Sequence, residues 1–503
     1  MNNVSAIRRW QKRAWKSPTL SFARALVKKY PQGRLYLVGG FVRDLLLGRG
    51  CKDIDFVVTG VPRAKLVAHL KKYGRVNFVG RTFGVFKFVP KGQHGNDAID
   101  IALPRLDLPK GRTGAYRDVK VISRSSVTIE DDLRRRDFTV NALAWNIFEK
   151  RMIDLGLGLK DLKARKLRTV GKPEDRFRED FSRMLRGLRF AAELNFSIEP
   201  KTWQALKFLV KHLNDVRDGL NIVPREVLAK ELLKTFYADP VKALELYDKS
   251  GALNVLVPEM MPMKTCPQPK PYHMEGTVWR HTVLALEVLK SKRFKTYFTE
   301  RPDAELIMAV LWHDLGKPYT LKTPKEHGVD RIRFDGHDSV GARMAKEIAE
   351  RLKLASPPME SHYHVNPDHL EWLIGHHLLL LHDRAREMKL TTIEKYFVRH
   401  PLAAKLQELI LIDSLATIPK GGRPALNHLR TLWRTLKRMG ERNHHLPPAL
   451  LNGDELMSVL NIPSGPMVGL LLRRLREQQL LGLVKTKRQA INFVLREHEK
   501  TNI

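Results

Sequence analysis

The chain has 503 residues, and its 89 lysine and arginine residues against 54 acidic ones give a formal net charge of +35. Several domains are expected, because a chain of this length exceeds one compact core. A composition that is 43% hydrophobic and 8% aromatic argues against a disordered chain. The positive charge is spread over every segment, which favours nucleic acid as the partner over anionic lipid or a merely soluble basic surface.

The targeting signals favour a cytoplasmic protein. Two cysteines, Cys51 and Cys266, cannot build a disulfide framework and predict a reducing compartment. No apolar run reaches the ~18 residues that a membrane helix needs, so no membrane association is expected. Residues 1–20 are basic and lack acids. They resemble either an organellar transit peptide or a basic arm that is flexible or contacts RNA, and we favour the arm.

Hydrophobic periodicity divides the chain into regions. A mixed α/β pattern comes first, with strands expected at 35–38, 54–58, 83–89 and 98–103 and a helix at 41–47. Helical periodicity dominates from about residue 161. Five prolines mark a linker, and Pro419–Pro424 marks a second boundary. The predicted domains are an arm (1–20), an α/β domain (21–160), an all-α region (161–257), a linker (258–271), a further domain (272–424) and a basic helical tail (425–503).

The α/β domain carries a pattern suited to phosphate and metal. Gly39 and Gly40 lie between a strand and a helix, where backbone N–H groups can approach a phosphate. Asp53 and Asp55 alternate along a predicted strand and therefore share a face. Asp100 is a third acid in a strand pattern. Clustered carboxylates suit Mg²⁺ and in-line phosphoryl transfer, whereas Asp53 and Asp55 alone would also fit a solvated strand edge.

Ordered motifs carry a family resemblance. Leu37–Gly48 with Lys52–Asp55, Arg135–Leu143 and Arg178–Phe190 resemble the bacterial and eukaryotic class of tRNA nucleotidyltransferases and bacterial poly(A) polymerases. The resemblance implies a nucleotidyltransferase palm at 21–160 and a helical neck and body at 161–257 for base selection and RNA binding. It also implies addition of C, C and A to the tRNA 3′ end from CTP and ATP, with Mg²⁺. The implied catalytic residues are Asp53, Asp55 and Asp100, with Mg²⁺ on Asp53 and Asp55; the implied nucleotide-binding residues are Gly39, Gly40, Arg43, Arg136, Asp137, Asn141, Asp180, Arg183, Arg186 and Arg189.

Asp180 and Arg183 suggest how bases are chosen without a template. Residues three apart are neighbours on a helix face, so an ordinary ion pair is the alternative. A carboxylate accepts from the exocyclic amine of cytosine or adenine, and a guanidinium donates to their ring acceptors. Guanine and uracil would present an oxygen to the carboxylate. The pair should therefore accept C and A and reject G and U.

Two segments bear on how far the resemblance extends. A later helical motif of the family is degraded, because Glu226 and Glu231 keep register but Val227 replaces an arginine. The segment Arg105–Tyr116 resembles the flexible loop that helps complete CCA-adding enzymes switch from CTP to ATP, and its glycines suit a mobile lever.

The region 272–424 carries histidines and aspartates on apolar helices, as metal sites do. Their order resembles the HD phosphohydrolase domain, which some bacterial tRNA nucleotidyltransferases carry. The resemblance implies a divalent transition metal whose identity the sequence does not give, and hydrolysis of phosphomonoesters or 2′,3′-cyclic phosphates. The implied ligands are His281, His313, Asp314 and Asp413, and His337 and His376 occupy the positions of extra ligands in two-metal members.

Several alternatives stay open at this point. The same chemistry would serve a poly(A) polymerase or an enzyme that adds only CC or only A. A different class of protein would be an HD phosphohydrolase with an RNA-binding N-terminal module. The tail is equally suited to a structural role and to grasping RNA, and oligomeric state is open. No base-stacking aromatic ladder is visible, so we expect tRNA to be recognised at its 3′ end and acceptor region through backbone and shape.

Overall fold

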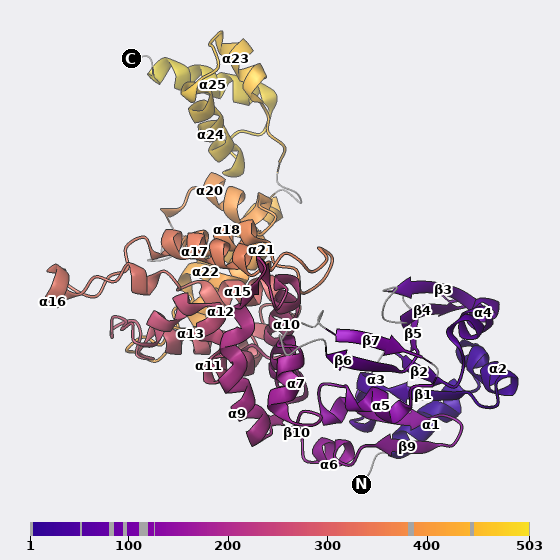
Figure 1. Ribbon diagram of the computed structural model, residues 1–503. Coiled ribbons are helices and arrows are strands. Elements are labelled where there is room, and N and C mark those ends of the chain that lie inside the picture. The colour runs from indigo at the N-terminus through magenta and orange to yellow at the C-terminus, as the bar shows by residue number, and fades with distance from the viewer. Residues whose placement is uncertain are drawn as a thin grey trace. The chain divides into compact units, whose positions relative to one another are not determined.

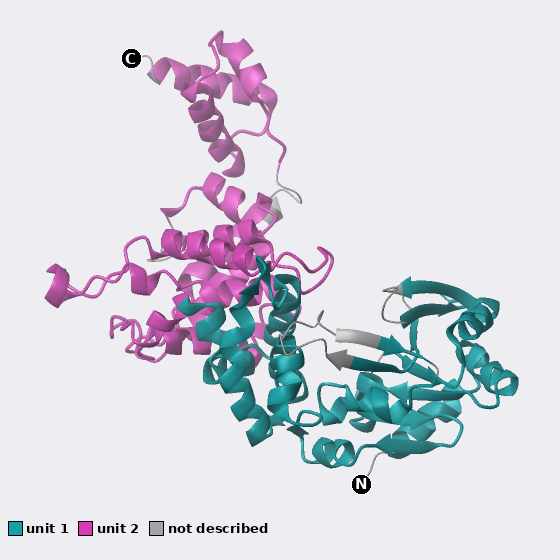
Figure 2. Ribbon diagram, in the orientation of Figure 1, with its two compact units in different colours: residues 1–258 teal, residues 259–503 magenta. Residues whose placement is uncertain are grey.

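The computed structural model describes residues 4–50, 53–79, 85–93, 98–109, 119–124, 126–380, 387–442 and 447–501. The chain forms two compact units, residues 1–258 and 259–503 (Figure 2). The expected fold class is confirmed, since a mixed α/β sheet domain is followed by helical regions (Figure 1). In the described residues no helix is both long and apolar enough to cross a membrane.

A seven-stranded sheet organises the first unit, in the order β3-β4-β5-β2-β1-β8-β9. Among its neighbouring strands only β2 and β5 run parallel. The structure confirms the strands expected near 35–38, 54–58, 83–89 and 98–103, and adds three that the sequence analysis did not anticipate. The strands are β1 (Arg34–Val38), β2 (Asp55–Thr59), β3 (Gly74–Val79), β4 (Val85–Pro90), β5 (Ile99–Ala102), β8 (Leu143–Asn146) and β9 (Arg151–Asp154).

The first helix is built into this domain. Ile7 on α1 is fully buried. Gln11 Nε2 donates to the carbonyl of Ile147 (2.6 Å), and Trp145 Nε1 donates to Gln11 Oε1 (2.7 Å). Residues 4–14 are therefore a packed part of the domain and not the flexible arm expected from their charge. The helices of the domain are α1 (Val4–Ala14), α2 (Ser21–Lys29), α3 (Gly39–Leu46), α4 (Arg63–Tyr73) and α5 (Ile129–Arg134).

A two-stranded ribbon, β6 (Arg105–Pro109) and β7 (Val119–Ser123), leaves the domain toward the helical region. The ribbon carries the start of the segment Arg105–Tyr116, for which a mobile loop is expected. Residues 110–118 lie outside the described residues, so the loop stays a prediction.

Helices complete the first unit. Helix α8 packs along α10, and Arg189 Nε donates to the buried carboxylate of Glu231 (2.6 Å) between them. Two short strand pairs interrupt the helices along the chain: β10 (Lys166–Leu167) with β11 (Ser197–Ile198), and β12 (Val216–Arg217) with β13 (Leu220–Asn221). The helices are α6 (Gly158–Lys163), α7 (Pro173–Glu179), α8 (Ser182–Leu194), α9 (Pro200–Leu209), α10 (Arg225–Ala238), α11 (Pro240–Ser250) and α12 (Ala252–Leu256).

The described part of the second unit has no β-sheet. Its helices include the 3-10 helix η5 (Pro258–Lys264), α13 (Val278–Val288), α15 (Ala304–Trp312), the 3-10 turn η6 (Lys317–Tyr319), α16 (Pro324–His327), α17 (His337–Arg351), α18 (Pro367–His376), α20 (Leu390–Glu394), the π-helical turn η8 (Lys395–Arg399), α21 (Ala403–Ala416), α22 (Asn427–Arg442), α23 (Gly453–Leu460), α24 (Pro466–Leu480) and α25 (Lys487–Thr501).

Two boundaries differ from the sequence-based ones. The proline-rich segment is folded, because Met260 and Met263 are buried and Gln268 Oε1 accepts from Lys317 Nζ (2.8 Å). Helix α22 was expected in the tail, yet Trp433 Nε1 donates to Gln407 of α21 (3.0 Å). The prolines interrupt the helical periodicity of the sequence, but the packed structure continues on both sides of them.

Candidate functional site

Acidic side chains gather where β2 and β5 run side by side. Asp55, the first residue of β2, is paired in register with Asp100, and Asp53 lies two residues before it. Burial, followed by the charge of Asp100, raises the pKa of Asp55 to about 6, and Asp53 adds to the rise while Arg136 opposes it. Burial also raises the pKa of Asp100. Repulsion between close carboxylates is relieved by a divalent cation, and oxygen donors suit Mg²⁺, so these three residues fit a metal site.

Gly39 and Gly40 open α3 beside this acidic group. Gly39 has φ +67°, and a Cβ atom there would lie 2.7 Å from Arg136 Nη1 and 3.8 Å from Asp55 Oδ2. A side chain would therefore clash with the arginine that faces the acids. No side chain caps the N-terminus of α3, which leaves N–H groups available to an anion.

A hydrogen-bonded network connects the predicted nucleotide-binding residues. Arg43 Nη1 donates to Asn141 Oδ1 (2.7 Å), and Asn141 Nδ2 donates to Asp137 Oδ1 (3.1 Å). Arg186 Nη2 lies 2.7 Å from Asp137 Oδ2. Although Asp137 is buried, the charge of Arg186 and these hydrogen bonds hold its pKa well below the ordinary value. The network joins the α3 side of the sheet domain to helix α8.

Asp180 and Arg183, the pair predicted to read bases, lie at a helix junction. Asp180 ends α7 and Arg183 lies in the first turn of α8, so the expectation of a single continuous helix is corrected. Asp180 Oδ1 accepts from Ser182 N (2.9 Å), and Arg183 Nη1 pairs with Glu179 Oε2 (2.6 Å). Among the described residues, the alternative of an ion pair between Asp180 and Arg183 is not seen, because Arg183 pairs with Glu179. Arg183 lines a cavity of about 170 Å³, and so do Arg134, Arg135, Arg176 and Asp107.

A second site lies in the second unit, where five helical segments bring histidines and aspartates together. His281 Nε2 is 2.9 Å from Asp413 Oδ1, and His313 Nε2 is 3.7 Å from the same oxygen. Asp314 Oδ2 is 3.4 Å from His313 Nε2. On its other side, Asp314 Oδ1 is 3.6 Å from His337 Nε2. All four expected core ligands and His337 therefore converge.

The last histidine of this cluster is His377 and not His376. His377 Nε2 lies 4.0 Å from Asp314 Oδ1, and Asp314, His337 and His377 form a buried group with metal-ligand spacing. His376 points elsewhere and stacks its ring on Trp372 at 4.6 Å. Adjacent residues at the end of a helix point about 100° apart, so the doublet alone did not identify the inward-facing ring.

The free ring nitrogens indicate a site prepared for metal. His313, His337 and His377 each use Nδ1 to contact a backbone carbonyl, at 2.8, 2.8 and 2.6 Å. Their buried Nε2 atoms have no hydrogen-bond partner. Burial, and then the nearby His313 and His337, lower the pKa of His377 to about 4. A neutral imidazole held by Nδ1 presents its Nε2 lone pair, which is the form that binds metal.

Two neighbours were missed in the sequence. Glu275 Oε1 accepts from His281 Nδ1 (2.9 Å) and contacts His273 Nδ1 (2.7 Å), and so orients His281. Lys317 Nζ lies 2.7 Å from Asp314 Oδ2. The Gly316-Lys317 pair close after His313-Asp314 is a signal that could have identified Lys317, whereas nothing in the local sequence distinguishes Glu275.

Regions in both halves of the chain match known proteins. Residues 35–168 match the Poly A polymerase head domain, and residues 275–414 match the HD domain. The A-adding tRNA nucleotidyltransferase of Deinococcus radiodurans is 34% identical over 74% of this chain and 80% of its own length. The CC-adding tRNA nucleotidyltransferase of Thermus thermophilus is 30% identical, covering 91% and 92%. The Multifunctional CCA protein of Acidovorax sp. is 35% identical, covering 64% and 68%.

A solved structure supports the fold. The CCA-adding enzyme of Bacillus stearothermophilus, in complex with CTP, superposes with a TM-score of 0.58 at 21% identity, over 97% of this chain and 99% of that one. Together with the relatives that match most of its length, this shows that the chain belongs to the tRNA nucleotidyltransferase family and carries an HD domain in its C-terminal half.

Proposed function

We propose that this protein adds C, C and A to the 3′ end of tRNA from CTP and ATP without a nucleic-acid template. The observation that carries the proposal is the register of Asp55 against Asp100, with Arg136 and the open end of α3 beside them. This arrangement can serve phosphoryl transfer from a nucleoside triphosphate. A tRNA substrate also agrees with the net charge of +35 and with the cytoplasmic location that the cysteine content predicts.

The roles of the head residues follow from their chemistry. Asp53 and Asp55 would hold Mg²⁺, with Asp100 as the third carboxylate. Mg²⁺ bound there supplies a lowered pKa for the attacking 3′-hydroxyl and charge neutralisation for the departing pyrophosphate. The N–H groups at the start of α3 and the guanidinium of Arg136 would orient the triphosphate. Asn141 holds Arg43 and Asp137 holds Arg186, which fixes the direction of both guanidiniums.

Asp180 and Arg183 would read the incoming base. The bond from Ser182 fixes the Asp180 carboxylate, and Arg183 borders the cavity beside Glu179. Exchanging Glu179 for a base would turn the guanidinium of Arg183 toward ring acceptors. A carboxylate that meets the oxygen of guanine or uracil costs roughly 1–3 kcal/mol, so the pair would reject those bases.

The test measures which ends are extended and with what. The protein is offered tRNA lacking CCA, tRNA ending in CC, and an oligo(A) primer, with CTP and ATP singly and together. We expect CTP alone to give two additions on the first substrate and ATP alone to give one on the second. Long tails on oligo(A) would identify a poly(A) polymerase, and a stop after CC, or extension of the CC end alone, would identify a partial enzyme.

A second activity is favoured by the three buried Nε2 atoms that face the Asp314 carboxylate and its neighbours. We propose that the HD domain binds a divalent transition metal and hydrolyses phosphomonoesters or 2′,3′-cyclic phosphates. His281, His313, Asp314 and Asp413 would hold one ion, and His337 and His377 could hold a second beside Asp314. A metal ion bound there would supply an activated water. Hydrolysis by this water would repair damaged 3′ ends before nucleotide addition.

Hydrolysis of 2′,3′-cyclic AMP and of a nitrophenyl phosphate is measured after loading with Mn²⁺, Co²⁺, Ni²⁺ or Mg²⁺. We expect activity with at least one transition metal and its loss on chelation. No hydrolysis with any loaded metal would contradict this second activity and leave nucleotide addition unaffected.

A further inference from the structure

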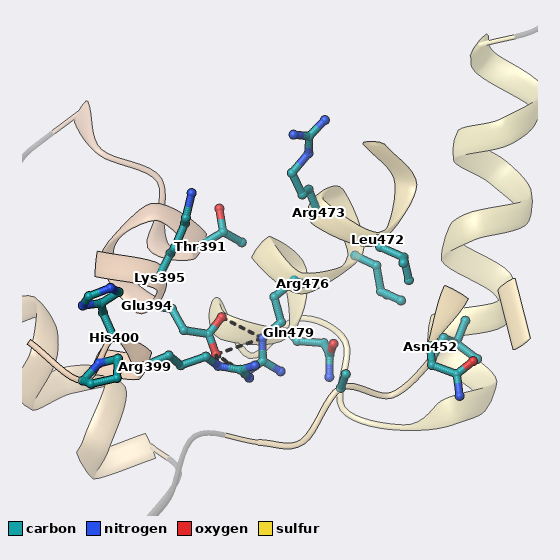
Figure 3. Close-up of a pocket in the computed structure, with 14 residues that line it drawn as sticks. Thr391, Glu394, Lys395, Arg399, His400, Asn452, Leu472, Arg473, Arg476 and Gln479 are labelled. Carbon is teal, nitrogen blue, oxygen red and sulfur yellow. Dashed lines mark hydrogen bonds and ion pairs between the residues drawn. The ribbon is translucent and has the colours of Figure 1, made fainter. Parts of the chain in front are cut away.

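A cationic cavity outside both reaction sites lies in the second unit between η8 and α24 (Figure 3). Its volume is about 600 Å³. Among the described residues that line it, the charged side chains are one carboxylate, Glu394, and four cations, Lys395, Arg399, Arg473 and Arg476. None of the acidic or histidine ligands of the two sites borders it.

The single carboxylate is fully engaged. Glu394 is buried, and its Oε2 accepts from Arg476 Nε (2.9 Å) while its Oε1 accepts from Arg399 Nε (2.9 Å). Figure 3 shows this pairing at the base of the cavity. Arg476 is further fixed by the carbonyl of Pro447 (2.6 Å). Since one carboxylate is shared by two guanidiniums, the wall keeps a surplus of positive charge.

The remaining cations face the opening from two different helical segments. Arg473 is exposed on α24, and Lys395 begins η8 (Figure 3). Lys395 Nζ lies 4.7 Å from the ring centre of Tyr396 and donates to its hydroxyl (3.2 Å). Cations on separate segments can contact successive phosphates of a nucleic-acid strand. A single phosphate is instead bound by cations that converge on one point.

Aromatic rings continue this wall. His400 borders the cavity and lies flat on Trp372, with ring centres 3.6 Å apart and an angle of 1°. Trp372 also stacks with His376, and His376 lies 5.1 Å from Tyr396. No base-stacking ladder was expected from the sequence, and these rings, which come from distant parts of it, stack on one another. Trp372 covers one face of the His400 ring, and His400 is among the residues that line the cavity.

The backbone between these groups is a π-helical turn, Lys395–Arg399. Single π-turns are rare and occur frequently at functional sites. The turn presents Lys395, Arg399 and His400 to one cavity. Cations that track a backbone next to a ring that stacks bases are the two elements of single-strand binding.

We propose that this cavity binds an unpaired RNA strand. Arg473 and Lys395 contact successive phosphates, and one base stacks on His400. The site works without reading sequence, because every base has a stacking face. It gives the C-terminal helices a role in holding RNA that is separate from nucleotide addition and from hydrolysis.

The test measures binding of a fluorescent eight-nucleotide RNA to the full chain by anisotropy, over a range of salt concentrations. The double variant Arg473→Ala/Lys395→Ala should bind about tenfold more weakly at 0.15 M salt. Its slope of log affinity against log salt should be shallower by about 1.4, because each single-strand phosphate contact contributes about 0.7. His400→Ala should weaken binding about fivefold or more with an unchanged slope, since stacking releases no counterion.

Arg474→Ala is the matched control, because Arg474 neighbours Arg473 but pairs with Glu497 at 2.9 Å and does not border the cavity. Thermal melting checks that His400→Ala remains folded. Equal effects of Arg473→Ala and Arg474→Ala, or unchanged binding in the double variant, would overturn the proposal. Full competition by CMP or inorganic phosphate at matched phosphate concentration would also overturn it, by showing that a small anion suffices.

Discussion

The two candidate metal sites are built in opposite ways. In the head, carboxylates meet at the end of two parallel strands, where burial, and then the charge of Asp100, raise the pKa of Asp55 to about 6. In the HD domain, three histidines each hold Nδ1 against a backbone carbonyl inside a helical core. The head site is oxygen-rich and offers an approach for a triphosphate, whereas the HD site is nitrogen-rich and buried.

This difference predicts different dependence on metal. Mg²⁺ dehydrates reluctantly and is usually held by one or two carboxylates together with substrate phosphates, so the head should bind it chiefly with nucleotide. Imidazole suits transition metals, and a site that is oriented in advance should retain its ion between turnovers. The predictions below test whether the two sites are independent in this sense.

The largest effect is expected from Asp55→Asn. Removal of this charge removes a metal ligand, so nucleotide addition should fall by about a hundred- to a thousandfold. Hydrolysis of cyclic phosphate should remain, because Asp55 belongs to the first unit alone. Single-turnover extension of tRNA measures the loss. Glu149→Gln, which changes an exposed carboxylate paired with Arg34, is the control, and equal rates for the two variants would refute the catalytic assignment.

The next effect separates adjacent histidines. His377→Ala removes a buried ligand, whereas His376→Ala removes a ring that stacks on Trp372. We expect the first to lower transition-metal content and hydrolysis by at least about tenfold and the second to leave metal content unchanged. Metal analysis after gel filtration measures this. Equal loss in both variants would show that the ring direction described here does not determine ligation.

Glu275→Gln extends that test beyond the ligands. Glu275 accepts from His281 Nδ1, so the variant should weaken metal binding by about 10- to 100-fold without removing a ligand. Titration with a metallochromic competitor measures affinity. Recovery in Glu275→Asp would support orientation of His281, whereas an unchanged affinity in Glu275→Gln would contradict it.

Local motifs predicted the head better than the HD cluster. Strand alternation placed Asp53 and Asp55 together because both belong to one short segment, and the third acid followed from its own strand pattern. The HD cluster depends on contacts that a local motif does not reveal. Glu275 reaches His281 through a turn. His377 and His376 differ only in the direction that the last turn of the helix gives to each side chain. The break between Asp180 and Arg183 was equally hidden, since spacing alone fits a continuous helix.

A smaller effect concerns the degraded helical motif. Glu231 is buried and pairs with Arg189 at 2.6 Å, whereas Glu226 is exposed in the first turn of α10. Glu231→Gln should destabilise the protein by about 2 kcal/mol, because it leaves Arg189 without its buried countercharge. Glu226→Gln should change stability far less. Denaturant unfolding compares them, and equal destabilisation would contradict the role assigned to Glu231.

The smallest effect concerns how the stability of the fold depends on pH, and it comes from a carboxyl group that belongs to neither candidate site. Burial, and then the charge of Asp303, raise the pKa of Glu408 on α21 to about 7. The folded state keeps this proton where the unfolded chain, with an ordinary pKa of about 4.5, has lost it. Glu408 therefore makes stability fall as pH rises from about 4.5 to 7, and the full penalty applies above pH 7.

Glu408→Gln removes that penalty. At pH 8 the free energy of unfolding of the variant should exceed that of the parent by an amount on the order of 2 kcal/mol after allowance for solvent screening, so the variant should melt at a higher temperature. The two proteins should match near pH 4.5. Glu347→Gln, an exposed change on α17, controls for charge alone. A gain that is the same at both pH values would show that the proton on Glu408 is not its source. A gain confined to pH 8 would show that burial beside Asp303 is what makes the charged form of Glu408 costly to the folded state.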